Sequence, residues 1–301
     1  MPLSSSSPDD LLEGFVSLYP EMKLLKTKAG CYGKETSTQG GITGTLLHFT
    51  LPMMVGSFLQ QCYNIADTLI VGQCIGAGAL AAVGSAYTLM VFLISVLLGL
   101  AMGSGTVFSL HYGAGNHVAL RRSIFSSFVL IGIVTLILNV AVFIWLDPIL
   151  RLLQVPQDIY GMMRSYLWII FCGIVFTFIY NFYASLLRAV GDSVTPLWFL
   201  AVSVVLNIAL DLFFILQLDW GIQGAAAATV LAQGVAALGI IIYTYRRRPE
   251  LRWHHEDMCF DRTCLKEIAS FSTLTCVQQS VMNLGILMVQ GLVNSFGTAV
   301  M

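Results

Sequence analysis

Two acidic residues lie inside apolar runs of the sequence, where an ionised side chain is costly. Asp67 falls in "NIADTLIVG" and Asp211 in "LNIALD", and neither run contains a lysine or an arginine. A carboxylate at the depth of a bilayer costs about 2.5–3.5 kcal/mol, so by default it faces a cavity and marks an ion or proton pathway. The alternative is a structural role, in which neighbouring amide groups satisfy the acid.

Two further polar residues, Asn207 and Thr229, lie at positions from which they could reach Asp211. Asn207 lies four residues before Asp211, which places both side chains on one face of a helix. Asp211 precedes Asp219 by eight residues, and Thr229 follows Gly221 by eight. At 1.5 Å per residue each lies about 12 Å from the turn between them, so Asp211 and Thr229 can meet across a helical hairpin.

Asp67, Asn207, Asp211 and Thr229 therefore form a candidate binding site for a cation or a proton. Asp67 lies before a turn at Gly72 or Gly76, a depth of about 6–14 Å that places it in the same half of the membrane as the others. Carboxylate, amide and hydroxyl oxygens are ligands that hard cations accept. A carboxylate removed from water can instead take up a proton. These residues leave Na⁺ and H⁺ both open as the bound ion.

The composition places these residues in membrane helices. Hydrophobic residues make up 57% of the 301 and charged residues only 10%, whereas soluble domains carry roughly 25% charged residues. Each apolar stretch has at least 22 residues, and a membrane-spanning helix needs about 20. We therefore expect an all-α polytopic membrane protein with seven transmembrane helices. The stretches are 46–71, 80–112, 124–146, 166–187, 197–218, 222–245 and 268–296.

Lysine and arginine are distributed unevenly around these stretches. If residues 1–45 form a flexible cytoplasmic tail, 13 of the 15 basic residues fall on the cytoplasmic side, and only Arg151 and Arg164 fall outside. Membrane proteins carry such an excess of positive charge in their cytoplasmic loops. We therefore expect a multi-pass protein of the cell membrane, most naturally a bacterial inner membrane, with a cytoplasmic N-terminus.

Motifs for nucleotide hydrolysis and for common hydrolases are missing. The sequence contains no G-x-x-x-x-G-K-[ST], G-x-S-x-G or H-E-x-x-H pattern. The segment "HHEDMCFDRTC" (254–264) offers two histidines and two cysteines, but their spacing does not match the usual zinc sites. We expect no enzyme, cofactor or metal, and an ion gradient or a bound partner would have to supply energy.

Four segments carry a family resemblance when they are taken together. They are "LPMMVGSFLQQCYNIADTLIVGQCIGAGALAAVG", "LRAVGDSVTP", "LNIALD" and "GIQGAAAATVLAQ". They resemble the multidrug and toxic compound extrusion (MATE) family of secondary transporters, from about Leu46 to Tyr245. The resemblance implies twelve helices in two six-helix lobes around a central cavity, with residues 46–245 forming the first lobe.

The resemblance also implies roles for individual residues. The family's first-lobe cation or proton site matches Asp67, Asn207, Asp211 and Thr229, with Tyr166 and Asn181 at positions near it. Pro52 matches the proline at which the first helix bends, and an internal proline does kink a helix because it deletes a backbone hydrogen bond. Without the resemblance, Tyr166 would be interpreted as an interfacial aromatic anchor, and Asn181 as a partner in an interhelical hydrogen bond.

The end of the chain resembles its first membrane segment. Gln278, Gln279 and Asn283 echo Gln60, Gln61 and Asn64 at an interval of about 220 residues, as in transporters built from parallel repeats. We therefore expect residues 246–267 to be a basic cytoplasmic loop between lobes, and residues 268–301 to be the first helix of a truncated second lobe.

The function that the resemblance implies is a cation- or proton-coupled antiporter that exports drugs and other amphipathic organic compounds by alternating access. Its expected partners are membrane lipid and small, cationic organic substrates, with no nucleic acid, and the protein is expected to be a monomer. Two alternatives remain. A lipid-linked precursor flippase would usually line its cavity with basic residues, and the apolar stretches contain none. A membrane-embedded enzyme would use Asp67 and Asp211 as a catalytic pair.

Overall fold

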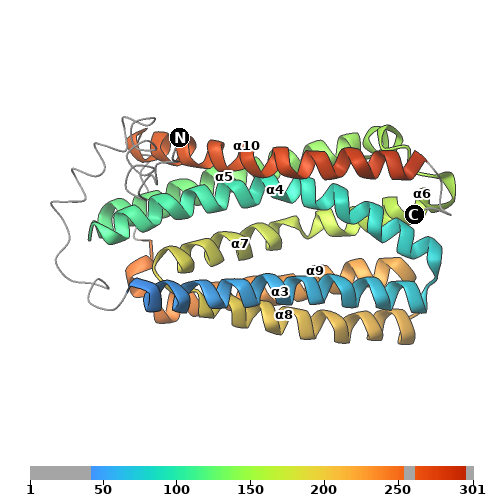
Figure 1. The fold of residues 1–301 in the computed structure, drawn as a ribbon, viewed down its shortest axis with the longest axis horizontal. Helices are drawn as coiled ribbons and strands as arrows, with labels where there is room; N and C mark the ends of the chain where they lie inside the picture. Colours follow the sequence, from blue (N-terminus) through green and yellow to red (C-terminus); the bar gives the residue numbers. More distant parts are fainter. Residues whose placement is uncertain (1–41, 254–261, 296–301) are drawn as a thin grey trace, which may run out of the picture.

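A computed structural model describes residues 42–253 and 262–295 of the 301-residue chain. Most of the expected N-terminal tail (1–45) lies outside these ranges, as do residues 254–261, which hold most of the segment with histidines and cysteines. The described residues form helices and no strand, and Figure 1 shows them running nearly parallel to one long axis. The expected all-α class is confirmed.

Eight α-helices account for most of the described chain. In order they are α3 (Ile42–Cys74), α4 (Ala77–Gly113), α5 (His117–Leu152), α6 (Gln157–Cys172), α7 (Ile174–Ala189), α8 (Val194–Leu212), α9 (Gly221–Arg247) and α10 (Arg262–Ser295). A π-helical turn (Phe213–Gln217) continues α8, and a short 3-10 turn (Pro249–Leu251) follows α9.

The lengths and composition of these helices suit a membrane. In the described ranges α4, α5, α9, α10 and the continuous helix α8 with its π-helical turn are each long and apolar enough to cross a bilayer, and α6 with α7 counts as a sixth span if the bent pair crosses as one. Helix α3 is not among these spans, and it carries the polar residues Gln60, Gln61, Asn64 and Asp67. It has 33 residues, however, and lies alongside the others in Figure 1.

The fourth expected membrane stretch is broken. The apolar run predicted a helix over 166–187, but α6 already begins at Gln157, and the pair bends by 49° where α6 meets α7. Gly173 lies at the break and is buried, and a Cβ atom there would overlap the side chain of Val230 on α9. The broken helix therefore packs directly against α9 at this point.

The helices form two groups with α6 and α7 between them. Helices α3, α8 and α9 lie side by side in one group, while α4, α5 and α10 form the other. Both α6 and α7 contact α4 on one side and α9 on the other. A cluster of rings from three helices, Phe108, Phe128, Phe178 and Phe182, packs within 5.2–6.1 Å between centroids.

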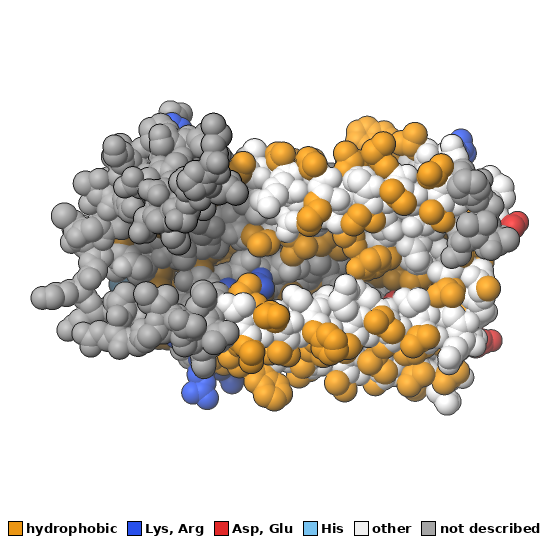
Figure 2. All heavy atoms as spheres, in the orientation of Figure 1, with side chains coloured by type: hydrophobic (Ala, Val, Ile, Leu, Met, Phe, Trp, Pro, Cys, Tyr) orange, Lys and Arg blue, Asp and Glu red, His pale blue; other side chains and the backbone are white. Residues whose placement is uncertain are grey.

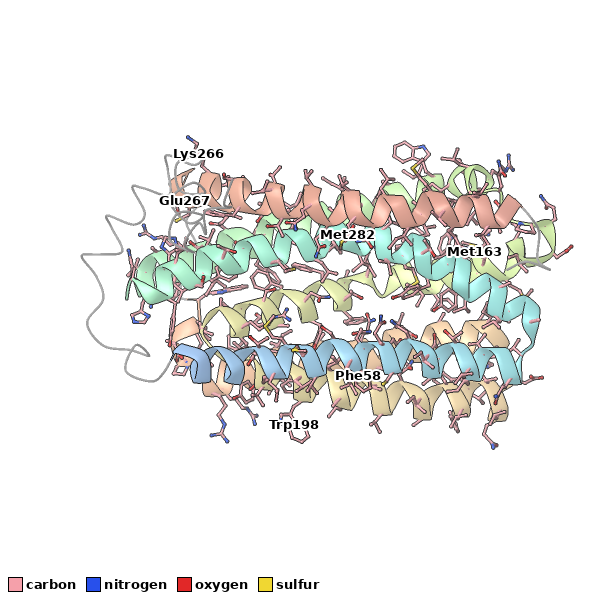
Figure 3. All side chains as sticks on the ribbon, in the orientation of Figure 1. Phe58, Met163, Trp198, Lys266, Glu267 and Met282 are labelled. Atoms are coloured by element: carbon pink, nitrogen blue, oxygen red, sulfur yellow. The ribbon has the colours of Figure 1, made fainter. Side chains whose placement is uncertain are left out.

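The outer surface is largely apolar. Phe58, Trp198 and Met282 are 71%, 68% and 62% exposed on three different helices, and Figure 2 shows hydrophobic side chains spread over the sides of the bundle. In Figure 3 the charged Lys266 and Glu267 lie at one end of the bundle, where α10 begins. An apolar belt with charges at its ends is the surface that a protein presents to lipid.

Helix α10 packs closely along α4 through glycine. At Gly99 and Gly103 the α10 backbone comes so near that a Cβ atom would overlap Cys276 and Ser272 respectively. The hydroxyl oxygens of Ser104 and Ser272 lie 3.4 Å apart at the same level. Small residues commonly allow such close approach of membrane helices.

The hairpin between α8 and α9 turns through left-handed backbone. Asp219 and Gly221 have φ angles of 52° and 53°. Glycine adopts this left-handed conformation without strain because it has no Cβ atom. The turn lies where the sequence "DWGIQG" predicted it, and it sets α8 and α9 side by side.

Candidate functional site

Three helices bring the four expected site residues together. Asp67 comes from α3, Asn207 and Asp211 from α8, and Thr229 from α9, and their exposed fractions are 7%, 0%, 0% and 5%. The carboxyl groups of Asp67 and Asp211 lie within hydrogen-bonding reach of each other. The spacing argument for the α8–α9 hairpin therefore agrees with the observed geometry.

Asn207 links the carboxyl pair to α9. With its amide nitrogen facing the acid, Asn207 donates to Asp211 Oδ2 at 3.0 Å and accepts from the backbone N–H of Thr229 at 3.3 Å. This orientation is the one that satisfies both ends of the amide. Because Asn207 and Asp211 are four residues apart on one helix face, a single turn of α8 supplies both groups.

Two tyrosines complete the surroundings of the acids. The hydroxyl oxygen of Tyr63 lies 3.2 Å from Thr229 Oγ1, and sequence reasoning missed this residue. Its position four residues before Asp67, on the same helix face, was the available signal. Tyr166 on α6 is only 4% exposed and lies close enough to interact electrostatically with both acids. A buried ring does not suit an interfacial anchor.

The carboxyl pair has no basic partner. Within the described ranges, neither Asp67 nor Asp211 forms an ion pair, and the Oδ1 atom of each lacks a hydrogen-bond partner. Two buried carboxylates at such a distance repel each other strongly. The site can relieve this repulsion by holding a proton between the two groups or by coordinating a hard cation with their oxygens.

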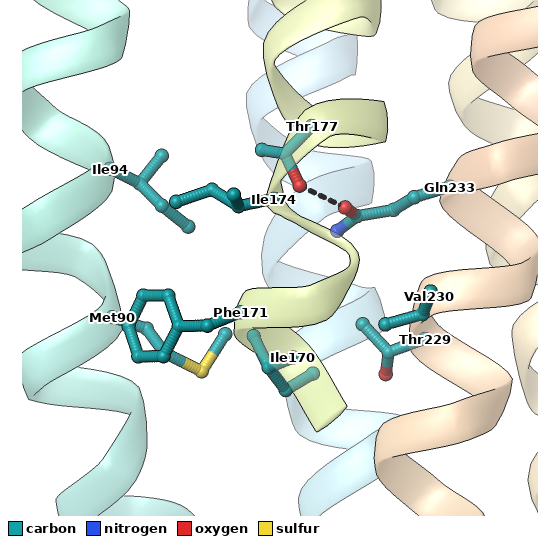
Figure 4. A pocket seen from close by; sticks show the side chains of 9 residues that line it. All are labelled: Met90, Ile94, Ile170, Phe171, Ile174, Thr177, Thr229, Val230 and Gln233. Carbon is teal, nitrogen blue, oxygen red and sulfur yellow. Dashed lines mark hydrogen bonds between the residues drawn. The ribbon is translucent and has the colours of Figure 1, made fainter. Parts of the chain in front are cut away.

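Asn181 belongs to a second polar group on α7 and α9. Its amide donates to the carbonyl oxygen of Thr177 at 2.8 Å, and the Thr177 hydroxyl donates to Gln233 Oε1. Figure 4 shows this bond beside a small cavity that Thr229 also lines. The cavity therefore lies between Asn181's group and the residues around the acids.

Pro52 lies far from the acids along α3. Fifteen residues separate it from Asp67, which corresponds to about 22 Å along a helix axis. Helix α3 is one continuous helix through Pro52, and Figure 1 shows α3 without a sharp bend along its length.

The helices extend beyond the apolar stretches and include basic residues toward their ends. These are Arg121, Arg122 and Arg151 of α5, Arg164 of α6, Arg188 of α7, Arg246 and Arg247 of α9, and Arg262 and Lys266 of α10. Arg164 falls within α6 because this helix begins earlier than expected, and its Nε atom lies 2.8 Å from Asp147 Oδ1. Arg188 falls in the last turn of α7. The apolar stretches themselves contain no lysine or arginine, and in the described ranges no basic side chain pairs with Asp67 or Asp211.

These features define a polytopic, all-helical membrane protein with a carboxyl pair buried among its helices. The model of the MatE family matches residues 52–213, which is more than half of the chain. The chain therefore belongs to the MatE family, in agreement with the resemblance of its motifs.

Individual relatives agree with this assignment. The chain is 33% identical over 267 residues to "Probable multidrug resistance protein YpnP" of Bacillus subtilis, covering 86% of the chain and 58% of YpnP. It is 31% identical over 210 residues to "Multidrug export protein MepA" of Staphylococcus saprophyticus, covering 67% of the chain and 45% of MepA. The chain thus spans about half the length of these relatives.

Solved structures share the fold. The Vibrio cholerae MATE transporter VcmN in its bent form has a TM-score of 0.74 at 26% identity, with 85% of this chain and 58% of that one covered. An outward-facing multidrug resistance MATE transporter has a TM-score of 0.77 at 24% identity, with 84% and 57% covered. Because its identity is only 24%, the similarity to the outward-facing transporter shows a shared fold alone.

Proposed function

We propose that the protein to which this chain belongs exports small, amphipathic organic cations in exchange for H⁺ or Na⁺. Drug export is supported by the relatives YpnP, a probable multidrug resistance protein, and MepA, a multidrug export protein. The single observation that supports ion coupling is the buried carboxyl pair of Asp67 and Asp211, which has no basic partner among the described residues. A proton or a cation is the natural third member of such a site.

The pair joins two helices, so its charge controls their attraction. Asp67 belongs to α3 and Asp211 to α8. When an ion or a proton is bound, the two carboxyl groups hold the helices together, and when it leaves, they repel. Binding at the site thereby favours one position of α3 over another, which is the requirement for coupling through conformation.

Helix α3 also carries polar groups that contact α4. Asn64 donates hydrogen bonds of 3.1 Å to Gln61 Oε1 and to the Tyr87 hydroxyl on α4, and Tyr87 is 44% exposed. These groups offer amide and aromatic surface to a substrate. A bend of α3 at Pro52 would displace both this surface and Asp67, so that the ion and the drug compete without sharing ligands.

The contact between the two carboxyl groups favours a proton. A hydrogen bond between two carboxyl groups requires that one of them is protonated, and Na⁺ would have to separate the oxygens to bind between them. We therefore propose H⁺ as the coupling ion, with Na⁺ as the second candidate.

The remaining proposals concern the setting of the transporter. The distribution of lysine and arginine supports an N-terminus in the cytoplasm, and the bacterial relatives support a bacterial inner membrane. We propose that the protein is a monomer there. A flippase is not favoured, because Arg164 is paired with Asp147 and Arg188 lies at a helix end. No basic residue of the described helices is paired with the two acids.

Export of ethidium from cells that lack their own drug pumps tests the proposal. Cells that express the protein with Asp211→Asn are expected to lose ethidium export, whereas Asp219→Asn, in the exposed turn after α8, is expected to retain it. Undiminished export by Asp211→Asn at equal membrane abundance would contradict the role of the pair.

A further inference from the structure

A second polar group lies one helical turn from the site along α9. Gln233 follows Thr229 by four residues, so the two side chains share a face of α9. Gln233 accepts a hydrogen bond from Thr177 of α7, and Asn181 follows on the next turn of α7. This group therefore lies farther than Thr229 from the α8–α9 turn, on the way to the opposite end of the bundle.

A small cavity separates the two polar groups. Thr229, Gln233 and Thr177 line it together with apolar side chains (Figure 4). The apolar lining residues are Met90, Ile94, Ile170, Phe171, Ile174 and Val230. The cavity has room for about one water molecule, and a buried water needs two to four polar partners. Thr177 and Gln233 provide such partners at one end of the cavity, and the Thr229 hydroxyl, which Figure 4 shows turned away from them, provides the third when its side chain rotates.

The break between α6 and α7 accounts for the cavity. Gly173 follows the last residue of α6, and its N–H donates to Ile170 O at 2.9 Å. Helix α7 begins at the next residue, and its axis is bent by 49° from that of α6. Interrupted helices occur at membrane depth only where the freed backbone is buried in protein or lines a wet cavity. The break lies beside Thr177 and Phe171, which border the cavity on its two sides.

We propose that this cavity binds a water molecule that bridges Thr229 to the Thr177–Gln233 pair and forms the first step by which the coupling proton leaves the acidic site. This inference rests on the proposed function. Thr229 connects the two regions, since its hydroxyl contacts Tyr63 of the site and its side chain lines the cavity. A proton that leaves a carboxyl group is taken up through this hydroxyl by the water, and the water passes on one of its own protons to bulk water beyond. One carboxylate is left behind, and the charge balances.

Hydroxyl-radical footprinting of the purified protein measures the hydration directly, because radicals form where water is held. Phe171 lines the cavity, whereas Phe182 is equally buried but does not line it, with exposed fractions of 1% and 0%. We expect Phe171 to be oxidised several-fold faster than Phe182. In the Gln233→Leu variant, which replaces the amide by an apolar side chain of similar size, the rate at Phe171 is expected to fall to that of Phe182. Equal rates in the unmodified protein would mean a dry cavity and would overturn the inference.

A transport experiment separates this inference from the proposed function. Thr177→Val is expected to slow proton-driven ethidium export several-fold without changing how tightly the protein binds the ion, and Thr177→Ser is expected to restore the rate. Asp211→Asn should instead remove ion binding itself. Export by Thr177→Val at the full rate would refute the route through the cavity and leave the site intact. Export by Asp211→Asn would refute the function.

Discussion

The carboxyl groups of Asp67 on α3 and Asp211 on α8 face each other within hydrogen-bonding reach in the interior of the bundle. Neither has an ion-pair partner in the described part of the chain. Their mutual contact joins α3 to the α8–α9 hairpin. A proton or cation bound between the two carboxyl groups therefore determines how strongly α3 is held against α8.

The first prediction concerns the two acids as a unit. Asp67→Asn and Asp211→Asn are each expected to lower ion-driven export by roughly 5–150-fold, the range of coupling free energies of about 1–3 kcal/mol. The double variant should be little worse than either single one, because each substitution already destroys the shared site. Ethidium efflux under an imposed pH gradient measures the effect. If the loss in the double variant equals the product of the two single losses, the acids act independently.

Tyr63 provides a test at the edge of the site. Tyr63→Phe removes the hydroxyl that lies 3.2 Å from Thr229 Oγ1, at a cost of about 0.5–1.5 kcal/mol in ion binding. Tyr180→Phe is the matched control, because the Tyr180 hydroxyl donates instead to Pro196 O at 3.0 Å, away from the acids. The ion concentration that half-saturates transport should rise only for Tyr63→Phe. An equal rise in both variants would argue against a local effect.

The α4–α10 contact makes a prediction about stability. In Gly103→Ala the added methyl group would overlap the backbone of α10 at Ser272. Overpacking of this kind typically costs about 1–3 kcal/mol of stability. Gly84 lies on the same helix with nothing within 4 Å of a Cβ atom, so Gly84→Ala is expected to be neutral or stabilising, since Ala suits a helix better. Thermal unfolding in detergent compares the two, and a lower Tm for Gly84→Ala than for Gly103→Ala would contradict the packing.

Asp192 secures the start of α8 and the end of α9. Its carboxylate accepts from the Thr195 backbone N–H at 3.0 Å and lies 3.4 Å from Arg248 Nη2. Loss of a capping side chain costs about 0.5–2 kcal/mol, so Asp192→Ala should lower the Tm. Asp192→Asn keeps the acceptor oxygen and should lose less. Equal losses would mean that the ion pair, rather than the cap, supplies the stability.

The sequence predicted those parts of the site that depend on regular helix geometry. Asp211 and Thr229 meet because both helices rise steadily from a turn that the residues around Gly221 mark clearly. The apolar run predicted this first helix over 46–71, and α3 extends from Ile42 to Cys74.

The parts that sequence analysis missed depend on packing between helices. Nothing in the run around Gly173 signals a break, because a single glycine is tolerated within a helix, and the close approach of Val230 becomes visible only in three dimensions. Tyr63 and Gln233 were overlooked for the same reason. Each has its partner on another helix, at Thr229 and Thr177 respectively.

The most direct test asks whether Asp67 and Asp211 share a proton. Infrared difference spectra of the purified protein, recorded between acidic and alkaline solution, report the C=O stretch of protonated carboxyl groups. We expect a band from a buried carboxyl group that disappears in both Asp67→Asn and Asp211→Asn, because a shared proton requires both partners, and that persists in Asp219→Asn. A band that survives unchanged in either of the first two variants would show that the acids titrate separately, and would contradict the account.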